Sequence, residues 1–273
     1  MATKKTSKVL GYDVYSASME SLAKHIASQV EKGSKIAVFA LNPNKAVIAD
    51  SDAELKAALN SAGALIADGV GICLAARAFG AKVERITGID LMHSLLGVFE
   101  AQSSPVLIYG AKEQSLLKAI DQIMAKHPGL QLAGHIDGYS LSEGQADSFI
   151  NESKAQCIFV ALGSPMQEKA IANRIMKLEH VRFAMGVGGS LDVIAGTVKR
   201  APKALRFLGL EWAYRLMQKP SRAKQIHLGK YIKLVIKELR AKNEGKRFGD
   251  WLHRPANSSA AGNRRPSGNR LRY

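Results

Sequence analysis

Residues 156–168 read Gln-Cys-Ile-Phe-Val-Ala-Leu-Gly-Ser-Pro-Met-Gln-Glu, and this stretch decides the fold class. Its first half is an apolar run rich in β-branched and aromatic residues, which is typical of a β-strand. The run is apolar throughout instead of alternating, which indicates a strand buried on both faces. A glycine-containing turn follows, and residues 165–178 then show the three-and-four spacing of an amphipathic helix. A buried strand that leads through a turn into a helix is the unit of a parallel α/β sheet.

The same unit recurs along the chain. Further strand-like runs lie at residues 35–41, 64–67, 105–110, 131–136 and 181–187. Helix-length amphipathic stretches lie between them, at residues 52–61, 71–79, 90–101, 114–126 and 142–153. We therefore predict an α/β fold with a Rossmann-like, mainly parallel sheet that carries helices on both faces.

The pattern changes after Pro202, where only helices are predicted, at residues 204–218 and 224–242. The second of these carries an apolar stripe of Leu228, Tyr231, Ile232, Val235 and Leu239, with lysines and an arginine beside it. Such a stripe either packs on the α/β core or lies on a lipid surface. The predicted organisation is an α/β core at 1–203, a basic helical, membrane-associating appendage at 204–247, and a disordered basic tail at 248–273.

The positive charge of the chain is confined to its C-terminal quarter. Residues 1–198 contain 19 Lys and Arg and 19 Asp and Glu, whereas residues 199–273 contain 20 Lys and Arg and 4 Asp and Glu, which accounts for the net charge of +16. Charge alone leaves three interpretations of this region: a surface for anionic lipid, a surface for nucleic acid, or a solubilising tail.

Other sequence features narrow the class of protein. The N-terminus has no apolar segment of a signal peptide, and no run approaches the roughly 20 apolar residues of a membrane-spanning helix. Cys73 and Cys157 form no metal-binding pair, and the seven histidines show no metal-ligand spacing. We expect a cytoplasmic protein without a metal site.

The candidate site residues follow the predicted strands. Parallel sheets bind ligands at the carboxyl ends of their strands, where helices begin with unpaired N–H groups. Asp68-Gly69 lies at such an end and suits a general base or a ribose ligand, although Asp-Gly is also an ordinary turn. Gly186-Val187-Gly188-Gly189, followed by Asp192, resembles a phosphate-binding turn, but this signal is weak when taken alone.

Taken together, the motifs resemble those of the TagA/WecG/CpsF glycosyltransferases, from about residue 10 to about residue 240. The motifs that carry this resemblance are residues 42–44, 67–71, 84–90, 163–168, 186–192, 195–196, 200–202 and 210–216. The resemblance implies an inverting, metal-independent glycosyltransferase without a cofactor. Its UDP-sugar donor would supply an N-acetylmannosamine-type sugar or the corresponding uronic acid. Its acceptor would be a polyprenyl-diphosphate-linked N-acetylglucosamine of bacterial cell-envelope polysaccharide synthesis.

The resemblance also assigns roles to individual residues. The three matched to catalytic positions are Asp68 as the proposed base, Arg85 and Gln167. The seven matched to substrate-binding positions are Asn42, Gly69, Gly188, Gly189, Asp192, Arg215 and Arg222. For Asp192 the alternative is a helix N-cap, and for Gln167 it is an amide at a helix N-terminus. For Arg85 the alternative is an ion pair with Glu84 or with a neighbouring helix. The chain departs from the family pattern at Met166, Leu191 and Gln225, where Lys, Phe and Arg are expected.

A lipid-linked acceptor favours the membrane interpretation of the basic region, which would place the protein peripherally on the inner face of the cell membrane. A possible homo-oligomer would form through apolar surface that the core exposes when the appendage lifts away. The alternative function is a nucleic-acid-binding α/β protein that uses the basic C-terminal region. Its aromatic residues are scattered and no RNA-binding signature is present, so we expect no nucleic-acid partner.

Overall fold

A computed structural model describes residues 5–202, 204, 205, 211, 214, 217 and 227–252, with residues 245–252 described as helix backbone only. Its centre is a six-stranded sheet in the order β4-β3-β8-β7-β5-β6, in which every pair of neighbouring strands is parallel. The strands are β3 (Ile36–Leu41), β4 (Ala64–Ala67), β5 (Val106–Gly110), β6 (Leu132–Ile136), β7 (Cys157–Ala161) and β8 (Phe183–Gly186). These six strands are the six that the apolar runs predict, so the α/β class with a parallel sheet is confirmed.

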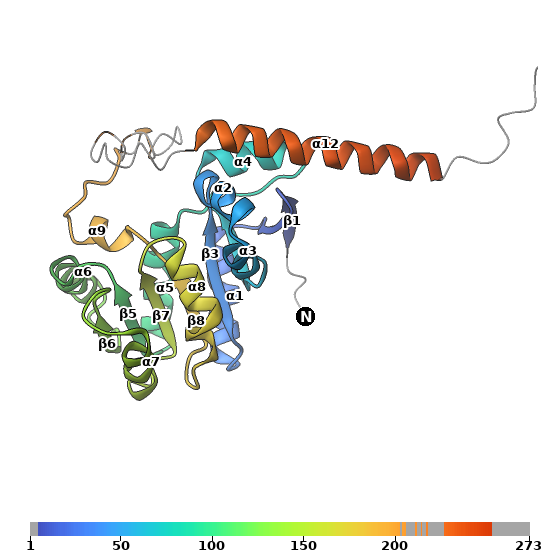
Figure 1. Cartoon of the computed structure of the whole chain (residues 1–273). Helices are drawn as coiled ribbons and strands as arrows, with labels where there is room; N and C mark the ends of the chain where they lie inside the picture. Colours follow the sequence, from blue (N-terminus) through green and yellow to red (C-terminus); the bar gives the residue numbers. More distant parts are fainter. Residues whose placement is uncertain are drawn as a thin grey trace, which may run out of the picture.

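Helices cover both faces of this sheet (Figure 1). One face carries α2 (Pro43–Ser51), α3 (Ala53–Asn60), α4 (Val70–Ala78), α7 (Glu143–Glu152), α8 (Met166–Asn173) and the short 3-10 helix η1 (Ile175–Lys177). The other face carries α1 (Met19–Glu31), α5 (Gly88–Ala101), α6 (Glu113–Lys126) and α9 (Ser190–Ile194). Along β3, Phe39 and Leu41 enter the first core, whereas Val38 and Ala40 enter the second. Both faces of the strand are therefore buried, which is why its sequence is apolar without alternation.

Helices α1 and α9 lie outside the predicted elements, and so do two further parts of the fold. An antiparallel hairpin of β1 (Thr6–Val9) and β2 (Tyr12–Tyr15) precedes the sheet. Val9 and Val14 from this hairpin are fully buried in the core beneath α2, α3 and α4. The second part is α2, which begins directly after Asn42. The Asn42 side chain accepts a hydrogen bond from the Lys45 N–H at 2.9 Å, and Pro43 occupies the first helical turn. The motif at residues 42–44 is therefore a helix N-terminus.

The C-terminal helix α12 (Leu228–Leu252) extends ten residues beyond the predicted end at 242. It lies over α2 and α4, and its far end projects from the α/β core (Figure 1). Tyr231 and Leu234 are buried against that core, and the Tyr231 hydroxyl donates a hydrogen bond to the Gly71 carbonyl at 2.8 Å. The Lys242 ammonium donates to the Phe79 carbonyl further along. Tyr231 belongs to the predicted apolar stripe, so this part of the stripe packs on the α/β core, which was the first of its two interpretations.

Candidate functional site

The predicted site residues lie after the strands at the carboxyl edge of the sheet. Asn42 follows β3, Asp68 follows β4, and the loops that lead to Gln167 and Gly188 follow β7 and β8. Because these four strands are neighbours in the order β4-β3-β8-β7, their loops share one edge. Helices begin at this edge with unpaired N–H groups, which makes it the part of the fold suited to an anionic ligand.

Asp68 and Arg85 are brought together at one end of this edge, although 17 residues separate them in the chain. Residue 85 forms a parallel bridge with Ala67, and the Ile86 N–H donates to the Ala67 carbonyl at 3.1 Å. The Asp68 N–H donates to the Leu41 carbonyl at 2.8 Å, which ties this turn to β3. The carboxylate of Glu84 accepts from the Met19 N–H, so Glu84 is oriented towards α1 and not held by an ion pair with Arg85.

The pKa of Cys73, in the first turn of α4, is affected by the charges of both Asp68 and Arg85. Burial, the largest cause, raises the pKa of the Cys73 thiol above its ordinary value. The positive charges of Arg85 and Arg77 oppose this rise in pKa, and the negative charge of Asp68 adds to it. The charges of Asp68 and Arg85 therefore act on one small volume beside α4.

Gly69 makes the transition from β4 into α4. Its φ of 97° lies in the left-handed region, which an L side chain adopts only with strain. No side chain caps the N-terminus of α4, so its first N–H groups point to the carboxyl edge without a capping partner from a side chain. This places backbone donors and the positive end of a helix dipole beside Asp68.

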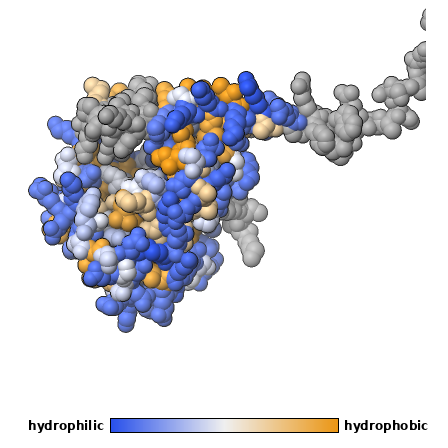
Figure 2. All heavy atoms as spheres, viewed as in Figure 1, coloured by the Kyte–Doolittle hydropathy of each residue, from blue (hydrophilic) through white to orange (hydrophobic). Residues whose placement is uncertain are grey.

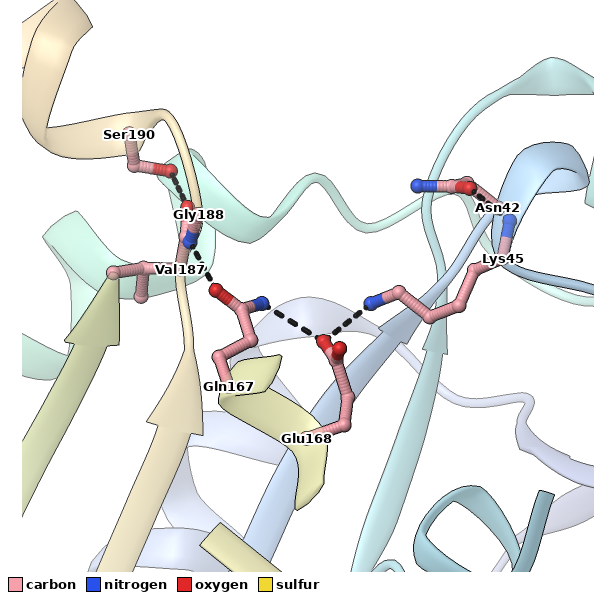
Figure 3. A network of polar contacts seen from close by, with 7 residues as sticks. All are labelled: Asn42, Lys45, Gln167, Glu168, Val187, Gly188 and Ser190. Carbon is pink, nitrogen blue, oxygen red and sulfur yellow. Dashed lines mark hydrogen bonds and ion pairs between the residues drawn. The ribbon is translucent and has the colours of Figure 1, made fainter. Parts of the chain in front are cut away.

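A buried polar network links the segments that follow β3, β7 and β8 at this edge of the sheet (Figure 3). The Gln167 side chain on α8 accepts a hydrogen bond from the Gly188 N–H at 3.0 Å and donates through Nε2 to Glu168 Oε1 at 2.8 Å. Glu168 Oε1 also contacts Lys45 Nζ at 2.7 Å. Three segments, which follow β3, β7 and β8, are thereby connected through side chains.

Neither Lys45 nor Glu168 receives a catalytic or binding role from the sequence. Glu168 lies in the motif 163–168, and Lys45 follows the motif 42–44, but each reads as an ordinary charged residue in the first turn of a helix. The two are 123 positions apart in the chain. Only the adjacency of β3 with β8 and of β8 with β7 brings them together.

The glycine turn after β8 is shaped around Gln167. A Cβ at Gly186 would lie 2.6 Å from Gln167 Nε2, and Gly188 has a φ of 49°. Gly189 precedes α9, and Asp192 lies in the first turn of that helix without acting as its N-cap. The Asp192 carbonyl accepts from Thr197 Oγ1 at 2.9 Å, which closes the end of this short helix.

An ion pair between Arg200 and Asp90 ties the segment after α9 to the start of α5. Arg200 contacts Asp90 Oδ1 at 2.6 Å, and the Thr87 hydroxyl donates to Asp90 Oδ2 at 2.6 Å. The motifs 84–90 and 200–202 therefore meet in space. Arg215 and Arg222, the two predicted arginines of the appendage, lie outside the described residues.

Within the described residues, no three His, Cys, Asp or Glu side chains are grouped so that they could hold a metal ion.

The model of the glycosyl transferase WecG/TagA/CpsF family matches residues 7–247. An N-acetylglucosaminyldiphosphoundecaprenol N-acetyl-beta-D-mannosaminyltransferase from Bacillus spizizenii is 31% identical over 239 residues, which cover 86% of this chain and 93% of the relative. The protein of the same name from Bacillus subtilis is 34% identical over 222 residues, which cover 81% of this chain and 85% of that relative.

Proposed function

The chain belongs to the WecG/TagA/CpsF family of glycosyltransferases, and from this premise we propose that it transfers an N-acetylmannosamine-type sugar from a UDP carrier. The acceptor in this proposal is a polyprenyl-diphosphate-linked N-acetylglucosamine, and the reaction inverts the anomeric carbon without a metal ion. The observation that carries the proposal is the backbone bridge between Arg85 and Ala67, the residue before Asp68, beside the N-terminus of α4, which no side chain caps.

The proposed reaction is a single displacement. The Asp68 carboxylate removes the proton from the acceptor hydroxyl while that oxygen attacks the anomeric carbon. The bond from this carbon to the diphosphate oxygen breaks, and UDP leaves with the bonding electron pair. A well-placed general base contributes a factor of about 10² to 10⁴ to the rate.

The leaving diphosphate needs positive charge or fixed hydrogen-bond donors. Arg85, the first N–H groups of α4 and the backbone of Gly189 are the groups that we assign to this task. Gly188 holds the glycine turn in place, because its N–H is bonded to the Gln167 side chain. Arg215 and Arg222 are assigned to the same diphosphate from the appendage by their match to the family motif. Asn42 and Asp192 are assigned to the sugar and nucleoside portions of the donor.

The test is UDP release from UDP-N-acetylmannosamine in detergent, with a lipid-diphosphate N-acetylglucosamine analogue as the acceptor and a chelator present. Wild-type protein should release UDP only when the acceptor is present, and Asp68→Asn should release almost none. Asp121→Asn, the same chemical change on the exposed surface of α6, is the matched control and should keep wild-type activity. Release that requires an added divalent cation would refute the metal-free mechanism.

We also propose that α12 contacts an anionic membrane surface. Leu228, Ile232 and Ile236 form a row along one side of the helix and are 52%, 50% and 43% exposed. Figure 2 shows hydrophobic residues along this helix beside hydrophilic ones. Lys230, Lys233 and Lys237 flank the row and are exposed. Exposed apolar side chains flanked by lysines are typical of a helix that lies in the headgroup region of a bilayer.

None of the described helices combines the length and the apolar character that crossing a membrane requires. The membrane proposal is tested by co-sedimentation of the full chain with vesicles that contain anionic lipid. Ile236→Ser should weaken binding several-fold, and added salt should weaken it further because exposed charges are screened. Leu117→Ser on α6 is the matched control, because Leu117 has the same 43% exposure. Equal loss of binding in both variants would exclude a specific role of α12.

A further inference from the structure

We infer that the buried Lys45–Glu168 pair is a positioning device for the proposed transfer, which sets the amide of Gln167 and thereby the Gly188 N–H at the donor site. The inference rests on the proposed function and names two residues that the family motifs leave without a role. Lys45 is 4% exposed and Glu168 is 0% exposed, so neither can touch a substrate in this arrangement. Both therefore act through a neighbour.

The direction of the Gln167 amide follows from hydrogen-bond chemistry. An ionised carboxylate only accepts hydrogen bonds, so the Gln167 NH₂ must face Glu168 at 2.8 Å. The amide oxygen must then face the Gly188 N–H, which it meets at 3.0 Å. A neutral group at position 168 would carry donors of its own and would accept either orientation of the amide. The Glu168 carboxylate, which only accepts, and the Gly188 N–H, which only donates, together determine which end of Gln167 faces the glycine turn.

Lys45 supplies the positive charge that faces this carboxylate inside the protein. The Lys45 ammonium lies 2.7 Å from Glu168 Oε1. The backbone N–H of Lys45 donates a hydrogen bond to the Asn42 side chain at 2.9 Å. A buried carboxylate without a positive partner is strongly disfavoured in its charged form. The chain of contacts therefore runs from Asn42 through Lys45, Glu168 and Gln167 to Gly188 (Figure 3).

Stability alone does not account for this pair. Desolvating two charges can cost more than their attraction returns, and apolar replacements of buried pairs are often neutral or stabilising. Glu168 Oε2 is in addition buried without a hydrogen-bond partner among the described residues, which adds to the cost. Buried ionic groups are best explained where they determine a unique arrangement, and here that arrangement is the orientation of one amide at the carboxyl edge.

The experiment compares wild type with Glu168→Gln and with the doubly neutral variant Lys45→Met/Glu168→Gln. The double variant removes both charges at once, so it folds even if the single variant leaves Lys45 too costly to bury. Lys169→Met is the matched control. Lys169 is the next residue on the same helix and makes ion pairs with Asp52 and Glu54, both at 2.9 Å, at the partly exposed surface.

Two readouts are needed. The first is the KM for UDP-N-acetylmannosamine and, separately, the KM for the lipid-linked acceptor. We expect the donor KM to rise about tenfold in both position-168 variants with the acceptor KM unchanged, because misplacement of a binding group by about 1 Å is enough for such a loss. The second is amide hydrogen exchange of the peptide that contains residues 186–190, which should become faster in both variants. Lys169→Met should change neither readout.

A merely structural role predicts a different result. It lowers the amount of active enzyme in proportion to the folded fraction, leaves both KM values unchanged, and is relieved in the double variant. Wild-type donor KM in the double variant, with or without faster exchange, would overturn the inference. If wild-type protein releases no UDP at all, the proposed function fails, and the exchange readout alone decides whether the pair sets the Gly188 contact.

Discussion

The two edges of the central sheet differ in what they offer to a ligand. The amino edge holds a hollow of about 500 Å³ beside Glu31, Gln102, Gln156 and Arg182. The carboxyl edge holds Asp68, Arg85, the glycine turns and the buried network of Lys45, Glu168 and Gln167. The hollow and the candidate site residues therefore lie at opposite edges of the sheet.

Helix direction explains this difference. Helices α1 and α5 end at the amino edge, and their last carbonyl groups are already satisfied by N–H groups such as those of Lys32 and Gln102. At the carboxyl edge helices begin, and the N-termini of α4, α8 and α9, which no side chain caps, present N–H groups and positive dipole ends to an anion. The direction of the helices, and not the presence of a hollow, is therefore our basis for expecting the donor to bind at the carboxyl edge.

The largest effect is expected at Asp68. Asp68→Asn should lower kcat by roughly 10² to 10⁴, because the amide cannot accept the acceptor proton. At the amino edge, Glu31→Gln makes the same kind of change in the wall of the cavity and should alter kcat by no more than about twofold. Steady-state UDP release measures both. Comparable losses in the two variants would remove the distinction between the edges.

Substitution of one glycine at each edge of the sheet tests the difference between the edges through packing. A Cβ at Gly186 would lie 2.6 Å from Gln167 Nε2, and a Cβ at Gly63, at the amino edge, would lie 2.5 Å from Ile36 Cγ1. Both Gly→Ala variants should lose roughly 1–3 kcal/mol of unfolding free energy through overpacking. Only Gly186→Ala should also raise the donor KM, because it alone displaces Gln167. Urea denaturation and donor kinetics together test this, and an equal rise in KM for Gly63→Ala would contradict it.

A smaller, pH-dependent effect is expected at the amino edge. The hydrogen bond from His127, at 2.9 Å, and that from the Gly129 N–H lower the pKa of Glu100 below its ordinary value. A carboxyl whose pKa is depressed in the folded state stabilises the protein above the pKa of the unfolded state. That contribution is lost as the pH falls through the lower, folded pKa.

Wild type should therefore unfold at a higher urea concentration than Glu100→Gln near neutral pH, and the difference should disappear in acid below the ordinary glutamate range. Transfer kinetics at neutral pH should be the same for both proteins. A difference in stability that persists unchanged in acid would show that packing, and not the charge of Glu100, is responsible.

The smallest effect is expected for Gln156→Ala, which enlarges the amino-edge cavity. Its unfolding free energy should change by about 0.5 kcal/mol or less, and its kinetics should match wild type. A clear loss of UDP release would mean that the amino-edge hollow takes part in the transfer reaction.

The sequence predicts a large part of this fold because its strands are buried on both faces. Their apolar runs are unbroken, so β3 and β7 stand out without any tertiary information. The hairpin of β1 and β2 escapes this signal, since its strands have four residues each and mix polar with apolar positions. Helix α2 escapes it as well, because its apolar residues do not gather on one side.

For the candidate site, the strand-end position of Asp68 and the glycine turns is visible in the sequence, because strands lead directly into polar loops. The roles that the family resemblance assigns to these residues remain predictions. For Gln167 the structure adds a partner on each side, Gly188 and Glu168, and so gives its buried side chain a positional task that the motif does not reveal.

By itself, then, the sequence determined the class of the fold, the positions of the six strands and the loops that carry polar residues. These properties depend on local composition and on hydrophobic periodicity, which are read within about ten residues. The order of the strands, the pairing of Lys45 with Glu168 across 123 positions and the meeting of Arg200 with Asp90 were decided only by the tertiary structure. The physical reason is that a charge has the same appearance in the sequence whether it is solvated or buried, and only the folded chain supplies its partner.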